Sequence, residues 1–217
     1  SVSFNIEQYS IVEMNYNNPA SLSGGYFVKE GELWINSQAV LQSGIQVGNG
    51  NANFAKLYIS HASTATMVAN AITVPTNSPN VTIGALNTSN LHTYSGTINL
   101  NNNDVNFDVV SAGGSVAFTN TISGTGKKKK ISPGLVRLSG SSTYTGKTVV
   151  NQGTLQYGAA NAIADASNVT LNGGKFSTGA TIGYSDTVGT LELTDNSIIE
   201  LGSGNNILAF AASNGVA

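Results

Sequence analysis

The sequence contains no cysteine and very little charge. Only 9% of its 217 residues are charged, nine Lys and Arg against eleven Asp and Glu, and the formal net charge is −2. Without cysteine the chain can form neither disulfides nor thiolate metal sites. Its charge balance does not indicate a protein that binds nucleic acid specifically. Stability must therefore come from burial and backbone pairing.

Proline and long hydrophobic runs are also scarce. The chain has four Pro, and no stretch approaches the roughly 20 apolar residues that a bilayer span needs. No basic segment followed by a short apolar run marks a secretory signal. Because the chain opens with Ser1 rather than Met, we expect a piece of a longer polypeptide. Attachment to an outer membrane would then require segments not present here.

Small polar residues are abundant instead. Asn is the most frequent residue, there are 25 Gly, and Ser and Thr are common. These residues favour caps, turns and left-handed backbone over helix interiors. Yet 40% of the residues are hydrophobic, which is not the composition of a disordered chain. The remaining fold class is an all-β protein with many short strands and tight turns.

Short runs of alternating apolar and polar residues recur along the whole chain. Examples are GELWINS, DVNFDVV, KTVVNQGTLQYG and GTLELTDNSIIELG. This period of two predicts half-buried strands. The Ala-rich segment 159–167 favours helix by composition, but it is shorter than the roughly 12 residues that an isolated helix needs. We therefore expect a loop or a single turn there.

The alternating runs belong to imperfect repeats. HTYSGTINLN at 92–101 matches STYTGKTVVN at 142–151, and GTLQ in the second copy is echoed by GTLEL at 189–193 and GELWI at 31–35. A Gly turn and a short strand repeated about every 20–25 residues indicate a solenoid. We predict a right-handed parallel β-helix of about eight to ten coils, as one continuous domain over 1–217. An antiparallel sandwich would explain the strands but not the repeats.

One segment carries a family pattern. Residues 122–157, ISGTGKKKKISPGLVRLSGSSTYTGKTVVNQGTLQYG, resemble the autotransporter-associated β-strand repeat, also called the passenger-associated transport repeat. The matching residues are Gly124, Gly126, Lys130, Gly134, Val136, Leu138, Ser139, Gly140, Tyr144, Thr145, Gly146, Thr148, Val150, Gly153, Thr154 and Leu155. The pattern covers one full repeat, and the first 120 residues match only in style.

The resemblance implies an extracellular or cell-surface location and a structural role. Such repeats usually form the β-helical shafts of bacterial surface or secreted adhesins. We expect that role here, without a cofactor. Alternatives are a filament subunit joined end to end by strand pairing and, third, a polysaccharide-degrading β-helix enzyme. Open coil ends would pair with the chain's own continuation or with another copy.

Four consecutive lysines depart from the family pattern. Lys130 falls on a usual Lys, but Lys128 takes a position where the family has an inward-facing Leu. An unpaired ammonium is costly to bury, so we expect a loosened strand, an outward displacement or a side chain that snorkels to water. The run Lys127–Lys130 could bind an anionic glycan, form a solvated turn, or be a poorly determined or engineered stretch of sequence. Of these we favour the solvated turn.

No residue pattern indicates catalysis or a metal centre. His61 and His92 lie far apart, so we expect no metal site and place His92 at a surface or corner. Asp104 and Asp108 would lie about 13 Å apart on a strand, too far for glycoside hydrolysis. The only Arg, Arg137, has no Asp near it in sequence. Thr187, in Asp-Thr-Val, is a candidate O-glycosylation site.

Overall fold

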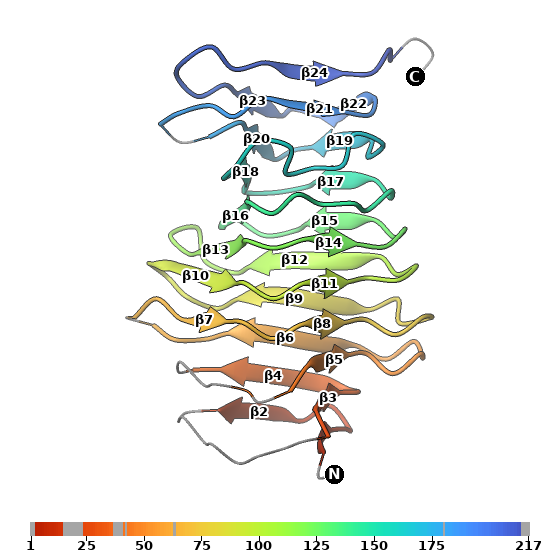
Figure 1. The fold of residues 1–217 in the computed structure, drawn as a ribbon. Coiled ribbons are helices and arrows are strands. Elements are labelled where there is room, and N and C mark those ends of the chain that lie inside the picture. Colours follow the sequence, from red (N-terminus) through yellow and green to blue (C-terminus); the bar gives the residue numbers. More distant parts are fainter. Residues whose placement is uncertain are drawn as a thin grey trace.

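The computed structural model describes residues 3–14, 24–36, 41, 43–62, 64–179 and 181–213. Within these residues all regular structure is β-strand, and none is helix. The strands stack along one axis into an elongated body, with the N-terminal strands at one end and the C-terminal strands at the other (Figure 1). The predicted all-β class is confirmed.

The longest sheet runs almost the whole length of the stack. It has nine strands in the order β2, β4, β6, β9, β12, β15, β17, β19 and β22. Their bounds are Ile11–Met14, Gly31–Ile35, Ala55–Ile59, Val81–Ala85, Val105–Val109, Lys128–Lys130, Thr148–Val150, Val169–Asn172 and Leu191–Asp195.

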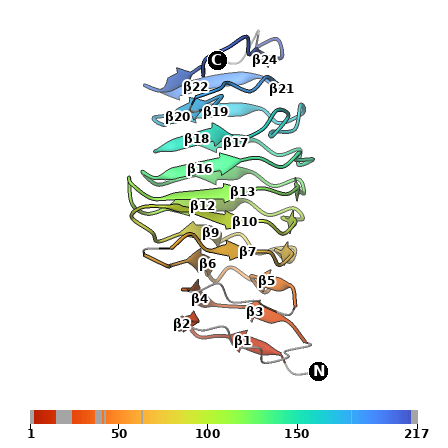
Figure 2. The same ribbon diagram turned by 60° about the vertical axis from the view of Figure 1, so that its left-hand side comes forward.

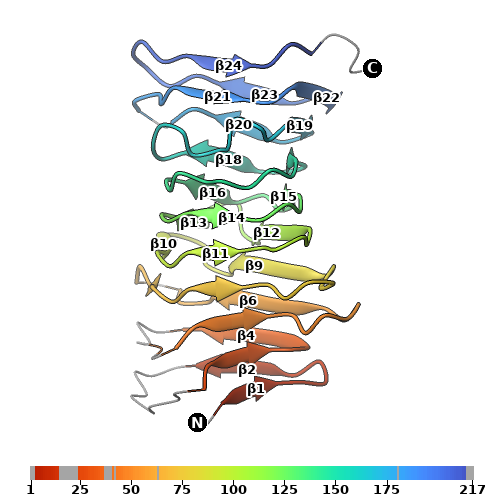
Figure 3. The same ribbon diagram turned by 45° about the vertical axis from the view of Figure 1, so that its right-hand side comes forward.

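Two further sheets form the other faces (Figures 2 and 3). The six-stranded sheet contains β1 (Phe4–Ile6), β3 (Tyr26–Val28), β5 (Ile45–Val47), β8 (Ile72–Thr73), β11 (Ile98–Asn99) and β14 (Ile122–Ser123). The seven-stranded sheet contains β7 (Met67–Val68), β10 (Leu91–Tyr94), β13 (Ser115–Phe118), β16 (Leu135–Leu138), β18 (Thr154–Tyr157), β20 (Lys175–Ser177) and β23 (Ile198–Glu200). A short pair, β21 (Asp186–Val188) and β24 (Leu208–Phe210), follows near the C-terminal end.

Each turn of the chain adds one strand to each of several faces. Every pairing between described strands is parallel, and partners lie between about 20 residues apart, as for Lys128 and Thr148, and about 26 apart, as for Ala55 and Val81. The result is a parallel β-solenoid of about eight turns. The repeat-based prediction of a parallel β-helix is confirmed, and the antiparallel sandwich is wrong.

Inward-facing side chains form columns along the axis. In the nine-stranded sheet, strand register stacks Leu33 on Leu57, then Ile83, then Phe107, all buried. In the six-stranded sheet Ile72, Ile98 and Ile122 stack in the same way. Alternation along each strand sends every second residue inward. No single turn could enclose these side chains, so each turn is stabilised by its neighbours.

Asparagines hold the corners between sheets. Asn77, Asn90, Asn101 and Asn161 have positive φ, from 49° to 67°, a conformation that Asn tolerates better than most residues. The buried amide of Asn103 donates to the carbonyl of Pro75 at 2.7 Å and accepts from the backbone amide of Ser78 at 2.7 Å. These bonds tie one turn to the next, which explains the abundance of Asn.

The six-stranded face loses its regularity above β14. Residues 139–147 take the next place without forming a strand, although the amides of Thr143 and Thr145 still bond to the carbonyls of Ile122 and Gly124 at 2.9 and 3.0 Å. Segment 159–167 then forms turns, not a helix, as predicted. This irregularity is confined to one face, because the nine-stranded and seven-stranded sheets continue past it.

Candidate functional site

The lysine run is a strand, not a turn. Lys128–Lys130 form β15, which pairs in register with β12 on one side and β17 on the other. The expectation of a solvated turn, and of a loosened or displaced strand, is therefore wrong. Strand alternation divides the run into an outward pair, Lys127 and Lys129, and an inward pair, Lys128 and Lys130.

The outward lysines share one carboxylate. Nζ of Lys129 lies 3.3 Å and Nζ of Lys127 lies 3.9 Å from Asp104, which also accepts the backbone N–H of Lys127 at 2.9 Å. Burial opposes ionisation of Asp104, but this hydrogen bond and the two lysine charges outweigh it and hold the carboxyl pKa below its usual value. The carboxylate neutralises much of the positive charge that an anion would meet here.

Lys128 lies inside the solenoid with only 2% of its surface exposed. It stacks between Val105 and Thr148. Its Nζ donates to the carbonyl of Gly126 at 2.6 Å and lies 3.3 Å from the centre of the Tyr144 ring. Burial lowers the pKa of Lys128 to about 7, although the negative charge of Asp104 acts in the opposite direction. The ammonium does not reach water, so the prediction that this side chain snorkels is wrong.

Lys130 is buried in the same interior with 1% of its surface exposed. It continues the column of Phe107 below and Val150 above. Its Nζ donates to the carbonyl of Ser132 and, at 3.3 Å, contacts the Ser132 hydroxyl, which accepts the N–H of Val109 at 2.6 Å. Burial lowers the pKa of Lys130 to about 8, against the attraction of Asp108.

Further polar side chains lie beside these lysines. The hydroxyls of Tyr144, Thr148 and Ser167 form a chain with spacings of 2.9 Å, which ends on the carbonyl of Gly146. Asp186 is also buried; burial raises its pKa, although it accepts backbone N–H bonds from Ile163 and Thr187. The space between Lys128, Lys130 and Tyr144 has no room for a water molecule.

This arrangement has a clear chemical limit. The inward lysines are enclosed by side chains and capped by carbonyl oxygens, so no external anion can reach their ammonium groups. Anion binding therefore remains a prediction for Lys127 and Lys129 alone. Sequence reasoning identified Lys128 as the inward position but missed Lys130, because the family pattern places a Lys there and gives no sign of its burial.

The other candidate residues are dispersed. Thr187 is exposed in β21, so its hydroxyl group is accessible, while the preceding Asp186 is buried. Asp108 accepts the hydroxyl proton of Tyr58 at 2.7 Å and lies on β12, whereas Asp104 precedes that strand. Each aspartate is engaged by partners of its own.

His92 is buried, which corrects its expected surface position. Its Nδ1 accepts the N–H of Thr66 at 3.0 Å and its Nε2 lies 2.9 Å from the carbonyl of His61; burial lowers its pKa. No group of three or more His, Asp or Glu side chains suited to a metal ion occurs in the described part of the chain. That part also lacks any helix of the length and apolarity needed to cross a bilayer.

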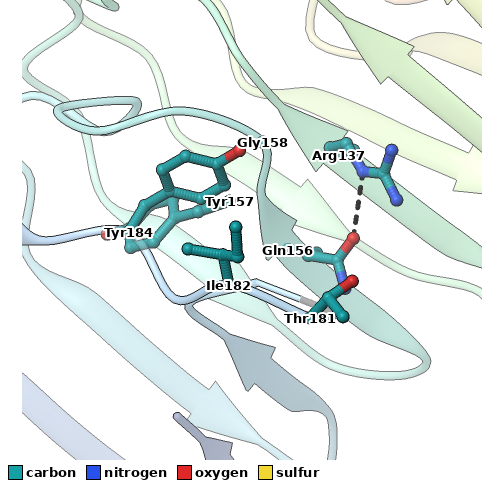
Figure 4. A pocket seen from close by; sticks show the side chains of 7 residues that line it. All are labelled: Arg137, Gln156, Tyr157, Gly158, Thr181, Ile182 and Tyr184. Carbon is teal, nitrogen blue, oxygen red and sulfur yellow. Dashed lines mark hydrogen bonds between the residues drawn. The ribbon is translucent and has the colours of Figure 1, made fainter. Parts of the chain in front are cut away.

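A surface pocket of about 200 Å³ opens above β16 and β18 (Figure 4). Arg137 and Gln156 stand on one side, Ile182 and the ring of Tyr184 on the other, and Thr181 at the edge. Nε of Arg137 donates to the side-chain oxygen of Gln156 at 3.0 Å. Nothing in the local sequence around Arg137 predicts this pocket, because its second wall comes from residues more than forty positions later.

The fold and one repeat within it can be compared with known proteins. A parallel β-solenoid built from short strands and Asn-rich corners fits an autotransporter passenger-like β-helix. Residues 130–156 match the family model of the passenger-associated-transport-repeat, which confirms the resemblance seen over 122–157. This repeat belongs to autotransporter passenger domains and is not a known enzyme family. No curated protein and no solved structure matches the chain.

Proposed function

We propose that this chain is part of the extracellular shaft of a bacterial surface or secreted adhesin, and that it has no catalytic role. The single observation that carries the proposal is the nine-stranded sheet. It runs in parallel register from β2 to β22 and makes one continuous stack of turns. Each turn extends the body by about 4.8 Å, which suits a part that holds a tip at a distance from a surface.

The proposal predicts that whole turns are interchangeable length units. Residues 81–104 span one period, because Val81 and Val105 are register partners. In the natural full-length protein, deletion of 81–104 should leave a folded and exported shaft that is shorter by about 4.8 Å. Antibody labelling of intact cells and protease shaving report export, and circular dichroism of the purified segment reports folding.

A matched deletion makes the test specific. Removal of 81–92, half a period, shifts every later strand out of register and should abolish folding. Equal damage from both deletions would contradict a modular shaft. A segment that stays inside the cell in the undeleted protein would contradict the extracellular location, which the repeat family supports.

A second candidate, the filament subunit, is favoured by the C-terminal turns. Leu193 continues the buried column of Leu171 yet is 63% exposed, and Ile199 on β23 continues that of Phe176 yet is 39% exposed. Such a row needs a cover, which another turn of the same chain or a second copy could supply. Electron microscopy of the purified chain separates the two: filaments that disappear in Leu193→Asp indicate self-association, and single rods at all concentrations exclude it.

A further inference from the structure

Arg137 is the one outward-facing cation without a carboxylate partner in the described residues, which include all eleven acidic side chains. Six lysines each lie within 4.0 Å of a carboxylate: Lys29, Lys56, Lys127, Lys129, Lys147 and Lys175. Lys128 and Lys130 are buried and capped by carbonyls. In a chain with so few charges, one half-buried guanidinium without a counter-charge at a pocket wall indicates a binding group.

The guanidinium is held in place by its neighbours. Its Nε donates to Gln156, so the group is fixed in orientation while both terminal nitrogens stay free of partners among the described residues. Gly158 lies against the stem of Arg137, where an added Cβ would come within 2.8 Å of Cδ. A larger residue at 158 would therefore displace the arginine. The planar fork of two N–H groups matches the two oxygens of a carboxylate.

The opposite wall of the pocket is apolar and comes from a later turn. Ile182 is 68% exposed, and the ring of Tyr184 stands behind it, with the hydroxyl of Thr181 at the edge (Figure 4). The backbone of this wall is already paired: Gly183 donates to the carbonyl of Ser203 at 3.0 Å, and Ser203 donates to that of Thr181 at 3.2 Å. It therefore offers no free strand edge to which an extended peptide could add.

We propose that this pocket binds a hexuronate unit of an acidic polysaccharide. Its volume of about 200 Å³ lies below the range of pockets for drug-sized molecules and suits a single sugar ring. The carboxylate pairs with the terminal nitrogens of Arg137. The C–H face of the ring packs on Ile182 and Tyr184, and its hydroxyls bond to Gln156 and Thr181. The site lies on the side of the solenoid. Binding there would be a function beyond the shaft role, and neither function depends on the other.

The test is a titration of the whole chain with sodium D-glucuronate, in which the backbone amide signals are monitored by NMR. We expect millimolar affinity, as is usual for a single small contact, with shifts centred on Gln156, Thr181 and Tyr184. D-Glucose, which lacks the carboxylate, should not bind, and acetate should bind at least tenfold more weakly than glucuronate. Arg137→Gln should weaken glucuronate binding about tenfold or more, because it removes a charge-assisted pair.

Two further variants keep the result decisive. Lys175→Gln removes another outward cation of the same sheet, one already paired with Glu200, and should leave binding unchanged. Arg137→Lys keeps the charge but loses the planar fork, so its affinity for glucuronate should fall. This variant provides the test if Arg137→Gln does not fold. Equal binding by Arg137→Lys and wild type, no binding to wild type, or shifts confined to Lys127 and Lys129 would overturn the proposal. So would acetate or a peptide C-terminal carboxylate that binds as tightly as glucuronate.

Discussion

The turns from β4 to β12 and the turns from β15 to β21 fill the same inward positions with different chemistry. In the lower turns this column of the nine-stranded sheet is aliphatic or aromatic, as in Leu57, Ile83 and Phe107. One turn higher the column continues with Lys130, and a buried carboxyl, Asp186, lies further along. Both regions keep the parallel register. A solenoid interior can therefore accept an ammonium where a carbonyl oxygen of the same chain is free to receive it.

The availability of carbonyl oxygens explains the difference. Lys130 donates to the carbonyl of Ser132, two residues on, and no strand amide bonds to that oxygen in the described ladder. The equivalent oxygen beside Ile83, that of Ala85, already accepts the N–H of Val110 at 3.3 Å. A lysine in the lower column would have to compete with this N–H for the oxygen or remain unpaired.

The largest expected effect on stability comes from placing a lysine in the buried column of the lower turns. Ile83→Lys should lower the free energy of unfolding by about 3–5 kcal/mol, because it leaves a charge buried without compensation. Thermal melting followed by circular dichroism measures the loss. Thr73→Lys, at an exposed position of β8 beside the uncharged partners Gln46 and Asn99, is the control and should change stability by less than about 0.5 kcal/mol. Equal stability of both variants would show that the lower interior tolerates ammonium groups as well.

The reverse exchange should stabilise the upper turns. Lys128→Leu places the residue that the family pattern has at this position and removes the cost of desolvating an ammonium. We expect the free energy of unfolding to rise by about 1–4 kcal/mol, the gain seen when buried charges are replaced by apolar residues of similar volume. Urea unfolding at neutral pH measures it. A loss of stability would mean that the contacts of Lys128 with Gly126 and Tyr144 outweigh its desolvation.

Stability should also rise with pH in a window that the buried lysines define. Their folded pKa values of about 7 and about 8 lie below the unfolded value of about 10.4. Between these values the unfolded chain binds more protons, so the free energy of unfolding increases with pH, by at most about 1.4 kcal/mol per pH unit for each lysine. The contribution is complete above about pH 10.4, is lost as pH falls through the folded pKa values, and does not change further at lower pH.

The double variant Lys128→Met/Lys130→Met tests the origin of this slope. The charged and titratable groups facing the two lysines are Asp104, Asp108 and Tyr144. The pKa of Asp104 is held below its usual value, and burial raises the pKa of Tyr144 above its ordinary value. The variant should therefore show a nearly flat profile of melting temperature from about pH 7 to about pH 10. A slope that persists in the variant would assign the pH dependence to other groups.

The same comparison shows how far sequence reasoning reaches. The parallel solenoid followed from period-two runs within a repeat of about 20–25 residues, since both are local patterns that stacking must satisfy. The state of Lys128 did not follow, because its stabilisation comes from Gly126 and Tyr144, whose orientation depends on tertiary packing. The Arg137 pocket could not be predicted from the sequence for a related reason. Thr181 and Ile182 line it only because the chain returns there two turns later.

The smallest expected effect concerns the outward half of the lysine run. Lys129→Ser removes an exposed ion pair with Asp104, so stability should fall by less than about 1 kcal/mol, and by less still in high salt. A sharper measurement is the carboxyl titration of Asp104 by carbon NMR, since its pKa is held below the usual value partly by Lys129. That pKa should move upward in Lys129→Ser but not in Lys147→Ser, whose lysine pairs with Glu192. An unchanged pKa would mean that Lys127, through its backbone N–H and its ammonium group, sets the charge of Asp104 without Lys129. Lys129 would then remain free to bind an anion.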